Sequence, residues 1–287
     1  MNKLSTAKRA AIMWALCEGN SIRATCRMTG AAKATVLSLL VELGEFCSVY
    51  QDYVLRNLSA TRVEADEIWA FVGAKQKNAK LESQGDVWTF TALDADSKLM
   101  ISWLVGNRSL QNATSFMKDV AARLANRVQL TTDGHSIYLT AVESAFGYNK
   151  VDYAQLVKSY GKAEEQGPGR RYSPMVCTGA VKERIMGNPV EELVSTSYVE
   201  RANLSMRMQM RRFTRLTNAF SKKMENHAHA VSLYFMYYNF CRAHTTLTKE
   251  HPMRYPTTPA MAAGVTDHVW KVEEILALMD PATVSVT

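Results

Sequence analysis

Three runs of β-favouring residues follow one another in the first half of the chain and limit the folds that it can adopt. They cover residues 62–72, 87–93 and 99–105, and the turn-like residues 94–98 separate the second run from the third. This spacing predicts a β-meander. The later elements, alternately helical and extended, are expected at residues 111–126, 128–133, 136–145 and 151–157. An antiparallel meander followed by helix-separated strands predicts an α/β fold with a mixed sheet and flanking helices.

Acidic residues occupy unusual places in these elements. Asp66 lies in the middle of the first expected strand, Asp133 ends the fourth just before Gly134, and Glu200 lies at the start of an expected helix. A carboxylate inside a strand is costly without a cation partner. Carboxylate oxygens are the ligands that Mg²⁺ prefers, and two such ions about 4 Å apart can activate an attacking oxygen and stabilise a leaving one. We therefore expect Asp66, Asp133 and Glu200 to be catalytic ligands of two Mg²⁺ ions, for which Mn²⁺ can substitute.

The surroundings of Glu200 favour phosphate chemistry. With about 100° per residue, the helix that begins near Ser197 has an apolar stripe and a polar one. The apolar stripe comprises Val199, Ala202, Met206, Met210 and Phe213. The polar stripe comprises Glu200, Asn203, Arg207 and Arg211. Arg201, Lys222 and Lys223 add further positive charge. An enzyme acting on sugars or peptides has little need of such cations, so we expect these basic residues and Asn203 to bind DNA. A solvated basic helix face is the alternative.

Other polar residues near the three acids compete for a role. Strand alternation turns Glu64 to the same side as Asp66, where it can be a peripheral ligand, and turns Glu67 to the opposite side. His135 and Tyr138 follow Asp133 and can contact DNA or the leaving oxygen. Packing and helix-start roles are at least as consistent with their positions.

The first 47 residues predict a small all-α domain. Ser5 and Ser21 can cap two helices, Gly30 ends the second, and a third helix follows. Two helices around a tight turn match the helix-turn-helix, in which the later helix enters the major groove. Lys33 and Thr35 would then meet phosphates or base edges. A helical bundle used for dimerisation is the alternative.

Three groups of residues together resemble the DDE transposases of bacterial insertion sequences, most closely the class named for insertion sequence one. The first group is Asp66-Glu67-Ile68-Trp69 with Val72-Gly73-Ala74-Lys75, the second is Thr132-Asp133-Gly134 with Tyr138, and the third is Tyr198-Val199-Glu200-Arg201-Ala202-Asn203-Leu204 with Arg207 and then Phe220-Ser221-Lys222. In order, they cover most of residues 62–240. The resemblance implies a ribonuclease H-like catalytic core that uses two Asp and one Glu. It also implies an enzyme that cleaves element ends and joins the 3′ hydroxyl to target DNA, as a homodimer or higher oligomer on the DNA.

The expected organisation follows from these patterns and from the distribution of glycine, proline and charge. Residues 160–190 carry Gly, Pro and basic residues, including Arg170 and Arg171, and predict a mobile basic insertion that contacts DNA; an ordinary solvated loop is the alternative. The expected divisions are a helix-turn-helix domain at 1–47, a linker at 48–60, a ribonuclease H-like core at 61–245 and a C-terminal tail with a short helix at 246–287.

Charge and cysteine content agree with a DNA partner. The 34 Lys and Arg against 27 Asp and Glu give a net charge of +7, which favours a polyanion. The five cysteines are odd in number and form no Cys-x-x-Cys pair, so neither a disulfide framework nor a zinc finger is indicated. We expect a cytoplasmic protein without membrane association, because no apolar run is long enough to span a bilayer and no signal-peptide cleavage site is evident. A nuclease or resolvase that cuts without joining, and an inactive DNA-binding repressor, are the competing interpretations.

Overall fold

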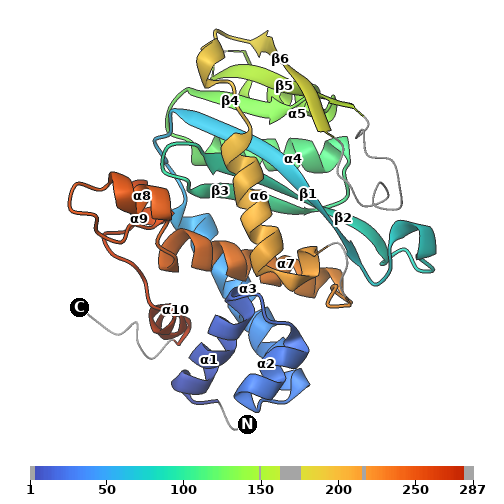
Figure 1. Ribbon diagram of the computed structural model, residues 1–287, viewed down its shortest axis with the longest axis vertical. Coiled ribbons are helices and arrows are strands. Elements are labelled where there is room, and N and C mark those ends of the chain that lie inside the picture. The colour runs from blue at the N-terminus through green and yellow to red at the C-terminus, as the bar shows by residue number, and fades with distance from the viewer. Residues whose placement is uncertain (1–3, 149, 162–175, 215–217, 281–287) are drawn as a thin grey trace.

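The protein, seen here as a computed structural model that describes residues 4–148, 150–161, 176–214 and 218–280, is built around one mixed sheet (Figure 1). The strands are β1 (Arg62–Val72), β2 (Gly85–Asp94), β3 (Met100–Gly106), β4 (Val128–Asp133), β5 (Val151–Gly161) and β6 (Val176–Met186). Their order is β3-β2-β1-β4-β5-β6. The β1–β2, β2–β3 and β5–β6 pairs are antiparallel, while β4 runs parallel to both β1 and β5. The expected meander and mixed sheet are confirmed, and the strand order is compatible with a ribonuclease H-like core.

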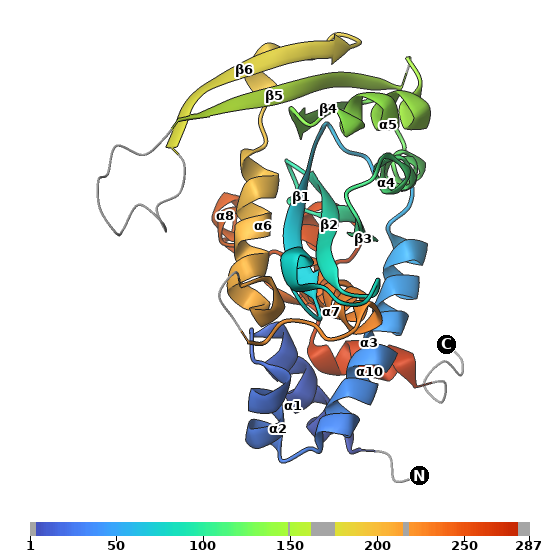
Figure 2. The same cartoon turned by 90° about the vertical axis from the view of Figure 1, so that its right-hand side faces the viewer.

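Helices cover both faces of this sheet. Two of them, α4 (Leu110–Arg123) and α5 (Ile137–Phe146), lie on one face, and α6 (Ser197–Gln209) lies on the other (Figure 2). All five residues of the expected apolar stripe are buried, but only Val199, Ala202 and Met206 lie in α6; Met210 follows its end and Phe213 belongs to the 3₁₀ turn η4 (Arg211–Phe213). The helix α7 (Met224–Met236) continues as a π-helical turn, η5 (Tyr237–Cys241). In that turn, the buried amide of Asn239 accepts a hydrogen bond from the Met100 N–H and donates one to the Met100 carbonyl, both at 3.0 Å. The turn therefore fixes the start of β3.

The three helices expected at the N-terminus are present, as α1 (Thr6–Cys17), α2 (Ile22–Thr29) and α3 (Lys33–Val54). The Ser5 and Ser21 side chains cap the first two, and Gly30 ends α2 with a φ of 65°. The third helix has 22 residues and continues beyond residue 47. Residues 48–54 are consequently helix, whereas the sequence suggested that the connector begins there.

Packing explains why α3 is so long. It lies against α7, and a Cβ atom at Gly44 would lie only 2.4 Å from the Cβ of His229, so glycine permits the close approach of the two helices. Buried side chains of α1 and α3, such as Ile12 and Leu40, belong to the same hydrophobic cluster as those of the sheet. The N-terminal helices and the sheet therefore share one continuous core.

Two expectations about the later chain need correction. Part of the expected loop at 160–190 forms the long strand β6, because its backbone pairs with the outer edge of β5; residues 162–175, with Arg170 and Arg171, lie outside the described residues. The expected single helix of the tail is in fact three, α8 (Thr245–Glu250), α9 (Pro259–Ala262) and α10 (Val272–Met279). The last of these packs on α1, where Arg9 and Asp280 form an ion pair at 3.1 Å.

Short 3₁₀ turns complete the described chain at η1 (Gln76–Asn78), η3 (Glu191–Leu193) and η4 (Arg211–Phe213). Across the described residues, every helix is too short or too polar to cross a lipid bilayer.

Candidate metal centre and basic groove

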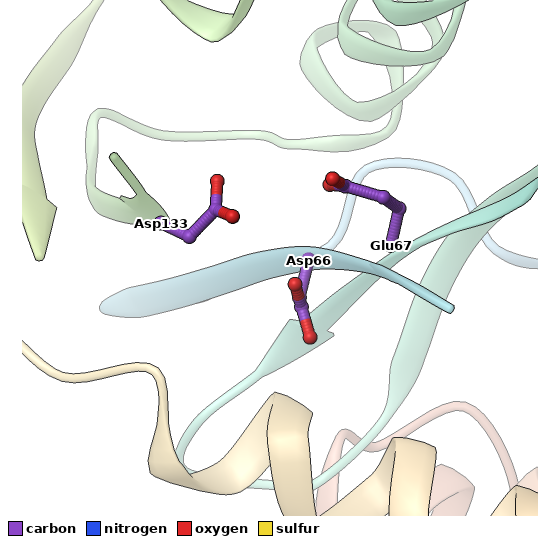
Figure 3. Close-up of side chains that lie close together, drawn as sticks. All are labelled: Asp66, Glu67 and Asp133. Carbon is purple, nitrogen blue, oxygen red and sulfur yellow. The ribbon is translucent and has the colours of Figure 1, made fainter. Parts of the chain in front are cut away.

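The parallel pairing of β1 and β4 brings two of the predicted acids together. Ala65 pairs with Thr132, so the residues that follow, Asp66 and Asp133, lie side by side. One carboxylate oxygen from each of Asp66, Glu67 and Asp133 lies within 4.8 Å of the other two. Figure 3 shows these three side chains, with Asp66 and Glu67 on opposite sides of β1. The sequence predicted the two aspartates and their approach to one site, but it assigned no ligand role to Glu67.

Asp66 points toward α6 (Figure 3), and there the Nδ2 of Asn203 donates a hydrogen bond of 2.9 Å to its Oδ2. The hydroxyl of Thr91 lies 3.2 Å from the Asn203 Oδ1 and 3.1 Å from the Asp66 carbonyl oxygen. Burial, together with the charges of Glu67 and Asp133, raises the pKa of Asp66 to about 7. Asn203 was expected to contact DNA, but it is only 6% exposed and its amide is occupied. It is a positioning residue for Asp66.

Glu67 lies on the opposite face of the strand and is fully engaged. Its side chain is 1% exposed and forms an ion pair with Arg108. Its Oε2 accepts a hydrogen bond of 2.5 Å from the hydroxyl of Tyr138, a residue that is completely buried. Burial first, and the charge of Glu67 second, raise the pKa of that tyrosine. Tyr138 is therefore a packing residue that holds Glu67 in place. Of the two roles that its position allowed, packing is the one that the structure shows.

Asp133 and His135 form the loop at the end of β4. The Asp133 Oδ1 accepts a hydrogen bond of 3.1 Å from the His135 N–H, and the Nδ1 of His135 accepts one of 3.2 Å from the Ile137 N–H. The imidazole thus serves the start of α5. Only one of the two oxygens of Asp133 is engaged by that loop.

Glu64 shares the face of Asp66, as strand alternation predicted, but it has a structural task. Its Oε2 accepts hydrogen bonds of 2.8 and 2.9 Å from the N–H groups of Tyr198 and Val199, in the first turn of α6. A carboxylate at a helix N-terminus satisfies unpaired donors and interacts favourably with the helix dipole. Although these bonds oppose it, burial raises the pKa of Glu64. The expected peripheral ligand is instead the anchor of α6.

Glu200, the third predicted ligand, lies outside the cluster that the described residues form. Its side chain is 44% exposed, forms an ion pair with Lys158 of β5, and accepts a hydrogen bond of 2.5 Å from the hydroxyl of Thr196. Partial burial lowers the pKa of Lys158, but the hydrogen bond and charge of Glu200 outweigh it, and the net direction is upward. The charge of Asp66 also acts on this ammonium group. Sequence reasoning missed Lys158, because nothing local marks a lysine in an edge region of a sheet as a partner for a distant helix.

A groove of about 1,000 Å³ separates the N-terminal helices from the segment after α6. Its polar lining includes six basic side chains and no acidic one among the described residues. These basic residues are Arg23, Lys33, Arg211, Arg212, Lys222 and Lys223. The groove thus brings Lys33 together with three other predicted DNA-binding residues, Arg211, Lys222 and Lys223, which lie 178 to 190 positions later in the chain. The lining of this groove is therefore basic, although the guanidinium of Arg212 is bonded to the Ser221 hydroxyl and the Asn226 carbonyl oxygen.

Arg211 lines this groove with Lys33, Lys222 and Lys223, whereas the remaining predicted DNA-binding residues of the described chain lie outside it. Since α6 ends at Gln209, Arg211 belongs to η4 and has left the polar stripe that the helical period suggested. Arg207 is half-buried, with its guanidinium 3.5 Å from the Phe213 carbonyl oxygen. Thr35 is half-buried near the start of α3, and Arg201 is exposed on α6, away from the groove.

No protein-family model matches the chain, and no curated protein matches it. Inferences about function therefore depend on the fold, the acidic cluster and the basic groove described above.

Proposed function

We propose that the protein is a Mg²⁺-dependent DNA transposase that cleaves the ends of an insertion sequence and joins the 3′ hydroxyl to target DNA. The observation that carries this proposal is the Asp66–Asp133 pair, contributed by adjacent parallel strands, together with α6, which carries Glu200 in its first turn. The basic groove and the net charge of +7 support DNA as the substrate.

The donor set fits a hard divalent cation. The cluster offers carboxylate oxygens alone, which Mg²⁺ and Mn²⁺ both accept. Burial and mutual repulsion hold the pKa of Asp66 near 7, and a bound cation would relieve both costs. Asp66 and Asp133 would hold the metal, and Glu200 would complete a two-ion site after releasing Lys158. Bound ions would activate the attacking oxygen and stabilise the leaving one.

The surrounding residues prepare this site in specific ways. Asn203 fixes the orientation of the Asp66 carboxylate, Glu64 ties the start of α6 to β1, and Lys158 keeps a positive charge beside Glu200. Such supporting contacts matter because metal ligands work only when their orientation is fixed. We propose that the groove binds DNA phosphates, that residues 1–47 act as a helix-turn-helix, and that two or more copies assemble on the DNA to hold both element ends.

Donor DNA with the inverted repeats that flank the gene provides the test. With Mg²⁺, wild-type protein should nick this DNA and join its 3′ ends to target DNA. Asp133→Asn and Glu200→Gln should lose both steps and keep wild-type DNA affinity, because each removes a metal ligand and leaves the groove intact. Glu82→Gln, an exposed glutamate outside the cluster, is the matched control and should remain active.

The outcomes separate the competing functions. Cleavage without joining would identify a nuclease or resolvase, and sequence-specific binding without Mg²⁺-dependent nicking would identify a repressor. Strand transfer at near wild-type rates by Asp133→Asn would exclude that residue as a required ligand.

A further inference from the structure

A second cavity, of about 280 Å³, lies between α6, the turn that joins β2 to β3, and the start of α8. Figure 2 shows α8 beside α6. Its volume is close to the lower end of the range for small-molecule sites, about 300–1,000 Å³. It is distinct from the acidic cluster, since none of Asp66, Glu67 and Asp133 lines it.

Three cations line this cavity without a counter-ion. Lys98, Arg201 and Arg242 form no ion pair with any residue in the described part of the chain. By contrast, six other arginines do pair with carboxylates. They are Arg9, Arg56, Arg62, Arg108, Arg123 and Arg127. Positive charge gathers in this cavity because its described lining holds no acidic side chain.

Lys98 is the most unusual of the three. It is only 7% exposed, and its ammonium group contacts the Ala95 carbonyl oxygen and lies 3.6 Å from the centre of the Tyr198 ring. A buried lysine without a paired carboxylate is rare, because desolvating the charge is costly. Its backbone also has a φ of 62°, a conformation that glycine or asparagine adopts more readily. Structures that tolerate such costs often do so at binding sites.

The carboxylates that act on Lys98 at longer range either have other partners or are exposed to solvent. Asp96 pairs with Arg62, Asp94 accepts hydrogen bonds from Ser97, and Glu250 lies exposed at the end of α8. None of them makes an ion pair with the ammonium group in the described chain. The charge of Lys98 therefore remains available to a ligand.

Hydrogen-bond donors complete the lining. The Nδ1 of His244 is buried and has no partner among the described residues, and Thr245 and Thr246 also line the cavity. Ser205 lines it as well, but its hydroxyl donates a hydrogen bond to the Arg201 carbonyl oxygen. Guanidinium groups match the oxygens of a phosphate in two-point contacts. The two arginines and the lysine of this lining therefore have the charge and donor chemistry that a phosphate group requires.

The position of the cavity on α6 relates it to the metal centre. At about 100° per residue, Arg201 and Ser205 each lie about 200° from Asn203, so the cavity and Asp66 occupy opposite sides of the same helix. Arg201 also follows directly after Glu200. Any ligand that orders Arg201 therefore acts on the helix that carries the third acid.

We propose that this cavity binds a phosphate group and, if the proposed function holds, that the phosphate belongs to a DNA strand that passes behind α6. A free phosphate ion has the same chemistry. The affinity of a labelled single-stranded oligonucleotide, measured with EDTA at constant ionic strength, tests both sources. Inorganic phosphate is then compared with chloride as a competitor.

Arg242→Gln is the informative variant, because Arg242 is exposed and lies outside the metal centre. It should weaken oligonucleotide binding by at least about tenfold and abolish the specific competition by phosphate. Lys249→Gln removes one exposed charge from α8, outside the lining, and should keep the wild-type affinity within about twofold. Thermal unfolding of each variant verifies that it is folded. Lys98→Gln is a second variant, which tests the same binding from the other side of the cavity.

Equal weakening by Arg242→Gln and Lys249→Gln, or competition by phosphate that does not exceed that of chloride, would overturn the proposal. Phosphate competition that depends on Arg242, together with unchanged oligonucleotide affinity, would keep the phosphate site and overturn its assignment to DNA. Failure of the proposed function is distinguishable, because it would appear as missing Mg²⁺-dependent cleavage in a wild-type protein whose phosphate binding is intact.

Discussion

Asp66 and Glu67 are neighbours on β1, and their two carboxylates have opposite surroundings. Glu67 faces α5, where Arg108 balances its charge and the hydroxyl of Tyr138 donates a hydrogen bond to it. Asp66 faces α6, where a neutral amide, from Asn203, is its side-chain partner. Burial therefore raises the pKa of Asp66 to about 7, because no cation among its described partners balances the charge of the ionised form. The same strand thus supplies one structural carboxylate and one that a cation can stabilise.

This contrast extends to the remaining acids on the α6 side. Glu64 caps the first turn of α6, and Glu200 is paired with Lys158. Whether an acid is structural or free to bind metal depends on the donors that its neighbours provide, and its own residue type does not decide this.

The largest difference between the two neighbours should appear in catalysis. Asp66→Asn should reduce single-turnover DNA cleavage by well over the roughly 100-fold that typifies loss of a group that merely orients a ligand. For Glu67→Gln, the loss in cleavage rate should stay within about 10–100-fold, because Glu67 supports the site through its contacts on the opposite face of β1. Rates at saturating Mg²⁺ provide the measurement. Equal losses of cleavage rate in the two variants would show that Glu67 is a metal ligand as important as Asp66.

The dependence of stability on pH should also distinguish Asp66. Its pKa is about 7 in the folded protein, against 3.8 for an ordinary aspartate, so between these values the folded state binds more protons than the unfolded state. Stability from this residue is consequently present below pH 3.8 and is lost as pH rises through 7. Without metal, Asp66→Asn should stabilise the protein at pH 8 by on the order of 2–3 kcal/mol relative to wild type.

Urea unfolding in EDTA between pH 5 and pH 8.5 measures this effect. The advantage of Asp66→Asn should grow with pH, and saturating Mg²⁺ should stabilise wild type but not the variant. A constant difference across the pH range would mean that Asp66 is not the group that titrates.

Glu67→Gln should have the opposite effect on stability. It leaves the guanidinium of Arg108 without its carboxylate and weakens the bond from Tyr138, so we expect a loss of about 2 kcal/mol in the free energy of unfolding. Tyr138→Phe removes the hydroxyl alone and should cost about 1 kcal/mol. Chemical denaturation at pH 7 compares the variants, and a Glu67→Gln protein as stable as wild type would contradict the structural role.

The smallest expected effect concerns the orientation of Asp66. Asn203→Ala should raise the Mg²⁺ concentration needed for half-maximal cleavage by about tenfold, because it removes the hydrogen bond that fixes the ligand. Leu204→Ala, at the exposed neighbouring position on α6, should leave this concentration unchanged. An unchanged metal requirement in Asn203→Ala would show that Thr91 and the backbone are sufficient to position Asp66.

Local sequence signals were sufficient for the elements near the site. The meander β1–β3, the end of β4 at Asp133 and the start of α6 at Ser197 follow from alternation, turn residues and helical period, which act over a few residues. The capping roles of Ser5 and Ser21 were readable for the same reason. The strand β6 was not, because its residues are Gly-containing and basic and they become a strand through pairing with β5.

The sequence by itself determined which residues carry negative charge into a strand and which side of β1 each carboxylate faces, and it predicted that Asp66 and Asp133 serve one site; their approach is a finding of the structure. The first two features depend on strand alternation, and the approach of the two aspartates follows from the parallel pairing of β1 with β4, which are separated in the chain by β2, β3 and α4. Only the tertiary structure decided the role of each acid, because their partners Arg108, Asn203, Lys158 and the first turn of α6 come from distant parts of the chain. Burial and these contacts set the free energy of each charge, and neither can be read from residues that are adjacent in sequence.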